Sequence, residues 1–506
     1  MNRRGFLKAG FLAAAAAGLP GRAPAAEAQR APAAGRPNII FIMTDQQFAD
    51  AMSCRMGKTW INTPAMDGLA DGGTLFSRAY SANPLCMPLR NSLFTGRYPH
   101  ETGVTRNAGV KLDTNEFVCM GTYFKQAGYA TGYFGKWHLC FDSKDPASHG
   151  FDSINTGAKD ADTADRAVQF LSEKRDKPFL LVVSFLNPHN ICEYSRGQDL
   201  SNGPIGDAPP PDKCPPAPAN LEPPENETDT MTTMRKGYHA ARTFPVGDFT
   251  PDQWRRLRWG YYRLIEKVDA ELGKVMAGLR KAGLADETVV IFTADHGDCA
   301  GAHRFNQKTV FYDESARVPL IIWGKGRAKK AVCDKLVNTG VDILPTMMDF
   351  AGIAAPKKLR GRSLRPPAAG EQPADWRRCV VVENDMAQAG TLDDGFHPAS
   401  QGRMVRSERY KYCIYEYGIR RESLVDMEKD PLEMRNLAGD PACRPVLEEH
   451  RRLLEQFAAE TADATASAML AGGVPPRPFP TGDRKNAAEP ATRRKQKTRP
   501  ADPKNG

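Results

Sequence analysis

Short apolar runs alternate with amphipathic stretches along most of the chain. Runs without polar alternation are typical of strands buried on both faces, as in a parallel sheet between two layers of helices. Such runs occur at 38–43, 129–134, 179–186, 288–293 and 318–323. We therefore predict an α/β fold over residues 37–370, with a large mixed, mostly parallel sheet flanked by helices on both faces.

One helix is clearly marked. Thr250 and Pro251 provide a cap followed by proline at the first helical position, apolar residues then recur every three or four positions, and Gly283 ends the pattern. The preceding residues, 196–250, are rich in Pro, Gly and Asn with little periodicity. We predict that they form a long surface excursion, a lid or a wall of the substrate site.

The pattern changes near residue 376. Short strands are indicated at 379–382, 404–407 and 410–417, some of them alternating, and a helix at 448–458. This predicts a smaller C-terminal α+β subdomain on an antiparallel sheet, over residues 376–470.

The composition is that of an ordinary globular protein, but the positive charge is concentrated at the two ends of the chain. The 506 residues carry a net charge of +9, with 41% hydrophobic residues. Residues 1–36 and 483–506 carry +5 each, so the body between them sums to −1. We predict that 483–506 is a basic disordered tail. The nearly neutral body gives no basic surface, so nucleic acid is not an expected partner.

The N-terminus resembles an export signal. An Arg3-Arg4 pair precedes Phe6-Leu7-Lys8 and a short apolar run, and Ala26-Glu27-Ala28 provides a cleavage site. We expect 1–28 to be a twin-arginine signal peptide, read by the twin-arginine translocase of a bacterium and directing the chain to the periplasm or beyond. The run is too short for a membrane-spanning helix, which disfavours an uncleaved anchor.

Polar residues follow four of the predicted strands directly. In an open α/β sheet, ligands bind beyond the carboxyl ends of the strands. Four of these residues supply carboxylate, amide and imidazole groups for one divalent cation: Asp45, Gln46, Asp295 and His296. Mostly oxygen ligands favour Ca²⁺ or Mg²⁺, and the imidazole leaves Mn²⁺ open.

Cations and proton carriers accompany this set. Lys136, Lys308 and Arg90 provide positive charge for an anionic substrate, and His138 and His189 are candidate proton carriers. Together with a metal, they indicate transfer of a sulfuryl or phosphoryl group. Histidines outside these motifs are candidates to line the substrate pocket: His100, His149, His239 and His397.

A resemblance to a known family supplies the nucleophile. Cys86-Met87-Pro88-Leu89-Arg90, followed by Ser92-Leu93-Phe94-Thr95-Gly96-Arg97, is similar to the signature of the sulfatases, in the alkaline-phosphatase-like superfamily. In that family a formylglycine-generating enzyme oxidises the cysteine to formylglycine, whose hydrate attacks sulfur. The resemblance extends over about 37–460 and implies that Cys86 lies at a helix N-terminus.

The resemblance also implies roles. The metal would be held by Asp45, Gln46, Asp295, His296 and the modified Cys86. Arg90, Lys136 and Lys308 would stabilise the charged oxygens of the transferring group. His189, helped by Lys308, would protonate the leaving alcohol, and His138 would deprotonate the second hydroxyl of the hydrate.

Departures from the family pattern keep alternatives open. Gln46 stands where a second Asp is common, His296 where Asn is common, and Leu89 where a small residue is usual. The first two also resemble phosphonate monoester hydrolases of the same superfamily, some of which use Mn²⁺. We expect a sulfatase acting on a sulfated small molecule or carbohydrate; the alternatives are a phosphonate or phosphodiester hydrolase and a non-catalytic protein that binds sulfated glycans.

Overall fold

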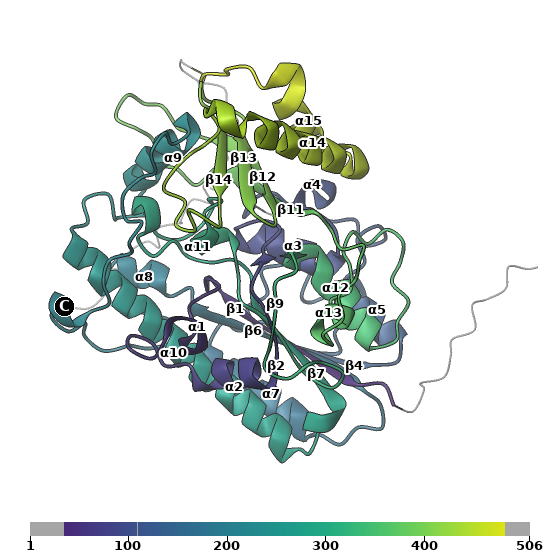
Figure 1. Cartoon of the computed structure of the whole chain (residues 1–506). Coiled ribbons are helices and arrows are strands. Elements are labelled where there is room, and N and C mark those ends of the chain that lie inside the picture. Colours follow the sequence, from purple (N-terminus) through teal and green to yellow (C-terminus); the bar gives the residue numbers. More distant parts are fainter. Residues whose placement is uncertain (1–34, 109, 481–506) are drawn as a thin grey trace, which may run out of the picture.

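The computed structural model describes residues 35–108 and 110–480, which form two stacked units (Figure 1). The predicted signal peptide, 1–28, and the predicted tail, 483–506, lie outside these residues. Across the described ranges, no helix combines the length and apolar character needed to cross a membrane.

The first unit is built on an eight-stranded sheet with the order β5-β4-β6-β1-β7-β8-β2-β9. The five strands β5, β4, β6, β1 and β7 run parallel to one another. The next strand, β8, is antiparallel to both β7 and β2. The predicted α/β class is confirmed. The bounds are β1 (Asn38–Asp45), β2 (Gly73–Phe76), β4 (Ala130–Gly135), β5 (Ser153–Asn155), β6 (Phe179–Pro188), β7 (Thr288–Ala294), β8 (Leu320–Gly324) and β9 (Ala331–Cys333).

Helices cover both faces of this sheet, as the continuous apolar runs predict. Ile40 and Ile42 of β1 pack with α2 (Pro64–Gly72), α7 (Asp160–Ser172) and α10 (Pro251–Lys281). The intervening residues Ile39, Phe41 and Met43 pack on the opposite side with α3 (Cys86–Thr95), α5 (Met120–Gln126) and α12 (Thr339–Phe350). All five β1 side chains are fully buried. A strand covered on both sides has no polar face, which explains the unbroken apolar pattern.

The helix predicted after Thr250 is present as α10. The Thr250 hydroxyl accepts the Gln253 N–H at 3.3 Å, and the Gln253 side chain accepts the Thr250 N–H at 2.8 Å. This reciprocal pair satisfies two backbone donors at the start of α10. Past the end of the helix, Gly283 adopts a left-handed conformation with φ 71°, which glycine enters without steric cost.

The predicted excursion 196–250 is not wholly irregular. It contains α9 (Asp229–Ala240), capped by the Thr228 hydroxyl. Met231, Met234 and Tyr238 form one apolar stripe that packs against the second unit. The sequence did not indicate this helix, because a helix in a polar sequence gains its stability from a partner that is distant in the sequence. The role of the segment as a lid or a wall of the substrate site stays a prediction.

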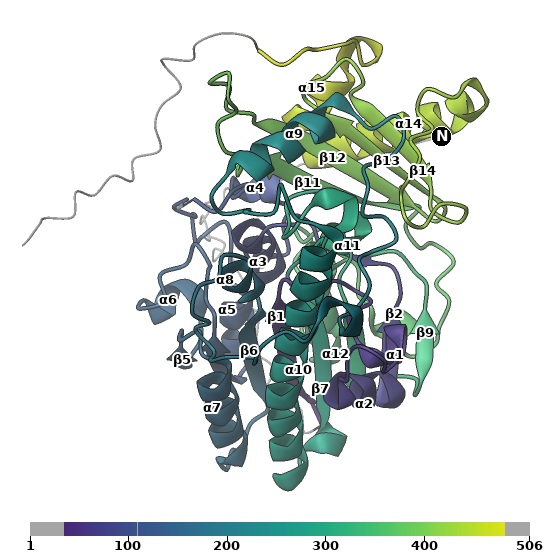
Figure 2. The same ribbon diagram turned by 90° about the vertical axis from the view of Figure 1, so that its left-hand side faces the viewer.

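The second unit is an antiparallel sheet with the order β11-β12-β13-β14, which confirms the predicted C-terminal architecture. Figure 2 shows it stacked on one end of the first unit. One face packs against α14 and α15, and the other against α9. The elements are β11 (Cys379–Met386), β12 (Ser400–Ser407), β13 (Tyr410–Tyr415), β14 (Glu422–Asp426), α14 (Arg444–Thr461) and α15 (Ala464–Leu470).

The remaining elements are short. Two of them, β3 and β10, pair with each other as a separate two-stranded sheet. The short elements are α1 (Ser53–Met56), β3 (Ala79–Tyr80), α4 (Pro99–Thr102), α6 (Pro146–His149), α8 (Ile191–Ser195), α11 (Asp313–Ala316), β10 (Val337–Asn338), α13 (Arg365–Ala368) and 3₁₀ turns at Pro211–Lys213, Ala285–Glu287, Ala302–Arg304, Pro441–Cys443 and Ala471–Gly473.

Candidate active site

The carboxyl ends of four adjacent parallel strands bring the predicted polar residues together. The strands lie in the order β4-β6-β1-β7. β1 ends with Asp45, and the residues that directly follow the other three are Lys136, His189 and Asp295. These residues follow strands that are far apart in the sequence. Because the strands are parallel, their carboxyl ends share one edge of the sheet, and the residues form one site.

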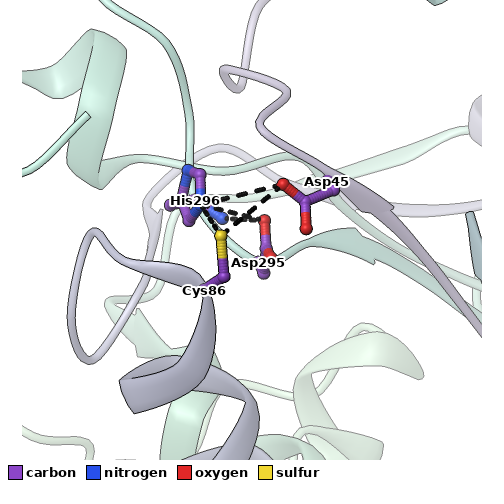
Figure 3. Close-up of side chains that lie close together, drawn as sticks. All are labelled: Asp45, Cys86, Asp295 and His296. Atoms are coloured by element: carbon purple, nitrogen blue, oxygen red, sulfur yellow. Dashed lines mark hydrogen bonds and ion pairs between the residues drawn. The ribbon is translucent and has the colours of Figure 1, made fainter. Parts of the chain in front are cut away.

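Cys86 lies at the centre of this site, as the first residue of α3, with 1% of its surface exposed. Figure 3 shows its sulfur pointing toward Asp45, Asp295 and His296. The Sγ atom lies 3.1 Å from His296 Nε2 and 3.8 Å from Asp45 Oδ1. The helix N-terminus adds a positive dipole end at this position. The predicted placement of Cys86 at a helix start is confirmed.

The charges around Cys86 favour an anion there. Burial and Asp45 raise the pKa of the thiol, but Lys136, Lys308 and His296 outweigh them and hold this pKa well below its ordinary value. Any group with an acidic hydroxyl at this position is therefore favoured in its deprotonated form.

Four side chains at the centre fit a divalent metal ion. Asp45, Cys86, Asp295 and His296 each offer one ligand atom, and these atoms lie within 4.8 Å of one another. His296 Nδ1 is 2.9 Å from the Gly297 carbonyl. Because a carbonyl only accepts, Nδ1 carries a hydrogen, and Nε2 faces the cluster, where it could bind a metal ion in its deprotonated form. This second contact orients imidazole ligands in metal proteins.

Gln46 lies beside this cluster and contacts a different set of groups. Its amide oxygen accepts from Lys308 Nζ at 2.7 Å, and its amide nitrogen donates to Asp298 at 2.7 Å. Its backbone N–H donates to Asp295 at 3.1 Å. Gln46 therefore orients Lys308 and Asp295; its predicted contact with the metal stays a prediction.

The buried side chain of Arg90 binds the carboxylates of Asp45 and Asp295. Its Nη2 donates to Asp45 at 2.8 Å and its Nε to Asp295 at 3.0 Å, while Nη1 donates to Ser184 at 2.8 Å. The guanidinium is fully buried. Each nitrogen thus has a protein partner, so Arg90 aligns the carboxylates. The predicted contact of Arg90 with the transferring group stays a prediction.

Two lysines flank the cysteine. Lys136 Nζ lies 2.6 Å from Asp45 and 3.9 Å from the Cys86 sulfur. Lys308 Nζ lies 3.3 Å from that sulfur and is buried. Burial alone would lower the pKa of Lys308, but Cys86, Cys192 and Asp45 raise it above its ordinary value. Both predicted cations therefore converge on Cys86. Their contact with an anionic substrate stays a prediction.

The two predicted proton carriers are half-buried. His189 follows β6, and burial together with the charges of Lys308 and Lys136 lowers its pKa to about 4. His138 follows β4 in a left-handed conformation, φ 49°, and its Nδ1 is buried without a hydrogen-bond partner among the described residues. A bound ligand could pair with this nitrogen. The predicted role of His138 as a proton carrier stays a prediction.

Asp160 supports His189 and was missed from the sequence. This carboxylate, the first residue of α7, accepts the N–H groups of Leu186 at 2.6 Å and Asn187 at 3.1 Å. The Leu186 carbonyl in turn accepts the His189 N–H at 3.0 Å. Burial raises the pKa of Asp160 to about 6, although the N–H bonds lower it. Nothing local in the sequence indicates partners 26 and 27 positions away.

Two of the histidines that we listed as candidates for the substrate pocket differ in their contacts. His149 is buried against Trp137 and Phe151, and its Nδ1 accepts the Phe151 N–H, while its Nε2 has no partner among the described residues. A pocket role for His149 therefore stays a prediction. His100 instead uses both ring nitrogens inside the protein, one with Glu383 of the second unit and one with the Thr461 carbonyl.

Comparison with known proteins establishes the family. Residues 37–353 match the sequence model of the sulfatase family, and residues 301–460 match that of the C-terminal region of N-sulphoglucosamine sulphohydrolase. The chain belongs to the sulfatase family. It is a sulfuric ester hydrolase, and the predicted membership is confirmed.

Individual relatives extend over most of this sulfatase. The Δ4,5-hexuronate-2-O-sulfatase of Bacteroides thetaiotaomicron is 31% identical, over 85% of this chain and 90% of the relative. The solved structure of a 2-O GAG sulfatase has a TM-score of 0.74 at 29% identity and covers 85% of this chain and 94% of that one. A phosphonate monoester hydrolase from Silicibacter pomeroyi has a TM-score of 0.69 at 25% identity, with coverage of 85% and 97%.

Proposed function

We propose that this sulfatase hydrolyses a sulfate ester of a carbohydrate, using formylglycine made from Cys86 and one divalent metal ion. The observation that carries the proposal is the convergence of Asp45, Cys86, Asp295 and His296 on one buried point, with two lysines beside it. The similarity to a hexuronate sulfatase supports a carbohydrate as the substrate.

The Cys86 sulfur stands in for the attacking oxygen of the matured residue. The metal would be held by Asp45, Asp295, His296 and matured residue 86, with Gln46 as a further candidate ligand; when bound, it would polarise an oxygen of the sulfate and favour the ionised form of the attacking hydroxyl. Arg90 keeps the two carboxylates aligned for this role through its ion pairs.

The chain's own side chains account for charge and proton transfer. Lys136 and Lys308 approach residue 86 and neutralise the sulfate oxygens. An oxygen of matured residue 86 bonds to sulfur as the bond from sulfur to the alcohol oxygen breaks, and His189 gives a proton to that alcohol oxygen. His138 then takes the proton of the second hydroxyl of residue 86, the bond from carbon to the sulfate oxygen breaks, and the carbonyl forms again as sulfate leaves; water hydrates it for the next turnover. Sulfate brings negative charge next to Lys136 and Lys308 and thereby favours the protonated form of His189.

The identity of the metal has its own test. Mostly oxygen donors favour Ca²⁺, whereas the His296 nitrogen also suits Mn²⁺, with Mg²⁺ as the third candidate. We expect chelation to lower turnover by roughly 10³-fold, the effect of losing about 4 kcal/mol of charge stabilisation. Adding back Ca²⁺, Mg²⁺ or Mn²⁺ singly should identify the ion by the activity that each restores. Full activity in metal-free protein would contradict the proposal.

A phosphonate monoester hydrolase is the second candidate, favoured by Gln46, His296 and the solved structure of that class. Protein matured by a formylglycine-generating enzyme should be assayed on 4-nitrophenyl sulfate and on 4-nitrophenyl phenylphosphonate. We expect the larger kcat/KM on the sulfate. A larger kcat/KM on the phosphonate would favour the second candidate, and binding of sulfated glycans without turnover of either ester would favour a non-catalytic role.

A further inference from the structure

A positively charged side chain outside the catalytic cluster lies on a loop that is attached to the nucleophile's helix. Arg106 belongs to the segment between α4 and α5. The next residue, Asn107, accepts the Met87 N–H with its Oδ1 atom at 3.1 Å. Met87 directly follows Cys86 in the first turn of α3. This contact fixes the loop, and with it Arg106, against the first turn of the helix that carries Cys86.

A second contact connects Arg106 to the segment that carries Lys308. Arg106 donates to Asp385 of β11 with Nε at 2.5 Å and Nη2 at 3.0 Å. The residue before Asp385, Asn384, donates to the carbonyl of Thr309 at 2.6 Å, next to Lys308. The Arg106–Asp385 pair therefore joins the two segments that approach the catalytic centre.

The pair holds the guanidinium rigidly and leaves part of it open to solvent. The Asp385 side chain is 9% exposed and also accepts from Thr105, whereas the Arg106 side chain is 51% exposed. Among the residues that the structure describes, Nη1 of Arg106 has no hydrogen-bond partner. A guanidinium held by two hydrogen bonds has already lost most of its rotamer freedom, so it binds a further anion at low entropic cost.

The other cations of the site are committed to groups within it. Lys136 binds Asp45, Lys308 binds Gln46, and Arg90 bridges the two carboxylates. These charges serve the sulfate that is cleaved. The free donors of Arg106 instead suit a second anionic group on the same substrate molecule.

We propose that Arg106, fixed by Asp385, binds a second oxyanion of the substrate and makes the enzyme selective for sugars that carry two anionic groups. This inference rests on the proposed function. Two chemical groups fit a guanidinium equally: the carboxylate of a uronic acid and a second sulfate.

The test compares substrates with and without a second anion. Matured wild type, Arg106→Ala and Arg106→Lys are assayed on 4-nitrophenyl sulfate, on an unsaturated 2-O-sulfated hexuronate disaccharide and on glucosamine 2-N,6-O-disulfate. For Arg106→Ala we expect kcat/KM to fall roughly 10- to 100-fold on one or both sugars, mainly through KM, the effect of losing a hydrogen bond to a charged group. Arg106→Lys should lose less, since it keeps the charge.

The control substrate and a control variant separate selectivity from damage. Turnover of 4-nitrophenyl sulfate should stay within twofold of wild type in both Arg106 variants. Arg420→Ala removes an arginine of the second unit that is 58% exposed and pairs with Asp229 of α9. This variant should change none of the three activities. Loss on the hexuronate alone identifies the carboxylate, and loss on the disulfate alone identifies the second sulfate.

Other results overturn the inference. Equal losses on all three substrates, or no loss on either sugar, would contradict it. Cleavage of 4-nitrophenyl sulfate with no binding of either sugar would also contradict it, while leaving sulfate hydrolysis intact. If wild type cleaves nothing, the proposed function fails, and calorimetric binding of the two sugars decides this inference: affinity that depends on Arg106 supports it, and affinity that does not depend on Arg106 overturns it.

Discussion

Among the residues that the structure describes, two clusters meet the same spacing criterion for a metal site but differ in how their polar atoms are paired. One is the catalytic cluster of Asp45, Cys86, Asp295 and His296. The other, which we call the joint cluster, consists of His100, Glu383 and Asp463, between the first unit and the second. Each combines a histidine with two carboxylates in positions largely shielded from water.

In the joint cluster, protein groups already satisfy the polar atoms. His100 Nδ1 lies 2.6 Å from Glu383, and Nε2 lies 3.1 Å from the Thr461 carbonyl. Asp463 accepts two hydrogen bonds from Arg403, at 2.6 and 3.0 Å. With its charges paired, this cluster holds α4 against β11 and the start of α15.

In the catalytic cluster, the carboxylates are also paired, but the cations converge on a single atom. Two lysines and an imidazole surround the Cys86 sulfur, and the Nδ1 atom of His138 has no partner among the residues that the structure describes. Ligand spacing alone therefore does not identify a metal site, because the joint cluster has it too. Changes in the catalytic cluster should alter turnover, and changes in the joint cluster should alter stability.

The largest expected effect is that of Cys86→Ala. Removing the nucleophile should lower kcat on 4-nitrophenyl sulfate by on the order of 10⁴-fold or more. Thermal unfolding should change little, since alanine fills most of the same buried space. A much lower unfolding temperature for this variant would contradict the expectation that the catalytic cluster contributes to turnover and not to stability. Wild-type turnover in this variant would contradict the role of Cys86 as the nucleophile.

His189→Ala should separate the leaving-group acid from the rest of the site. We expect roughly 10²- to 10⁴-fold slower cleavage of an alkyl sulfate, the usual contribution of a general acid. Cleavage of 4-nitrophenyl sulfate should fall by no more than about tenfold, because nitrophenolate leaves without a proton. The measurement is kcat/KM for both esters. Equal losses on the two esters would contradict the role of His189 in protonating the leaving alcohol.

Asp160→Ala tests whether this carboxylate positions His189. Loss of the two accepted N–H bonds should displace His189 and lower kcat on an alkyl sulfate by roughly 10- to 100-fold, with KM nearly unchanged. The loss on 4-nitrophenyl sulfate should be smaller, which a purely structural defect would not produce. Asp160→Asn keeps one acceptor and should retain more activity than Asp160→Ala; the reverse order would contradict a positioning role.

His100→Gln should show the smallest kinetic effect and a clear loss of stability. Breaking the contact with Glu383 should lower the free energy of unfolding by about 1.5–3 kcal/mol, with turnover within twofold of wild type. Denaturant unfolding of both proteins measures the first quantity.

The stability difference should also depend on pH. Burial alone would lower the pKa of His100, but Glu383 and Asp463 raise it above its ordinary value. A group whose pKa is raised by folding stabilises the fold fully below its unfolded pKa, about 6.5, and this contribution is lost as the pH rises through the folded pKa. The difference between wild type and His100→Gln should therefore be larger at pH 6 than in alkaline solution. A difference that grows with pH would contradict the pairing.

Much of the catalytic layer could be predicted from sequence because its signals are local. Continuous apolar runs indicated β1, β4, β6 and β7, and parallel topology then placed Asp45, Lys136, His189 and Asp295 at one edge. The Thr250 cap and apolar spacing likewise defined α10.

The features that sequence reasoning missed depend on distant partners. The helix α9 forms against a sheet that begins at residue 379, and Asp160 acts on the end of β6. His100 is a joint residue only because Glu383 lies 283 positions away. Local patterns identify strands and caps, but they do not reveal which buried charges will find a partner.

The most direct test is to relate turnover to the maturation of Cys86. Protein is co-expressed with graded amounts of a formylglycine-generating enzyme, and mass spectrometry of the peptide that contains residue 86 gives the modified fraction in each preparation. We predict that kcat on 4-nitrophenyl sulfate rises in proportion to this fraction and approaches zero when cysteine is unmodified. Turnover that does not depend on the modified fraction would contradict the account.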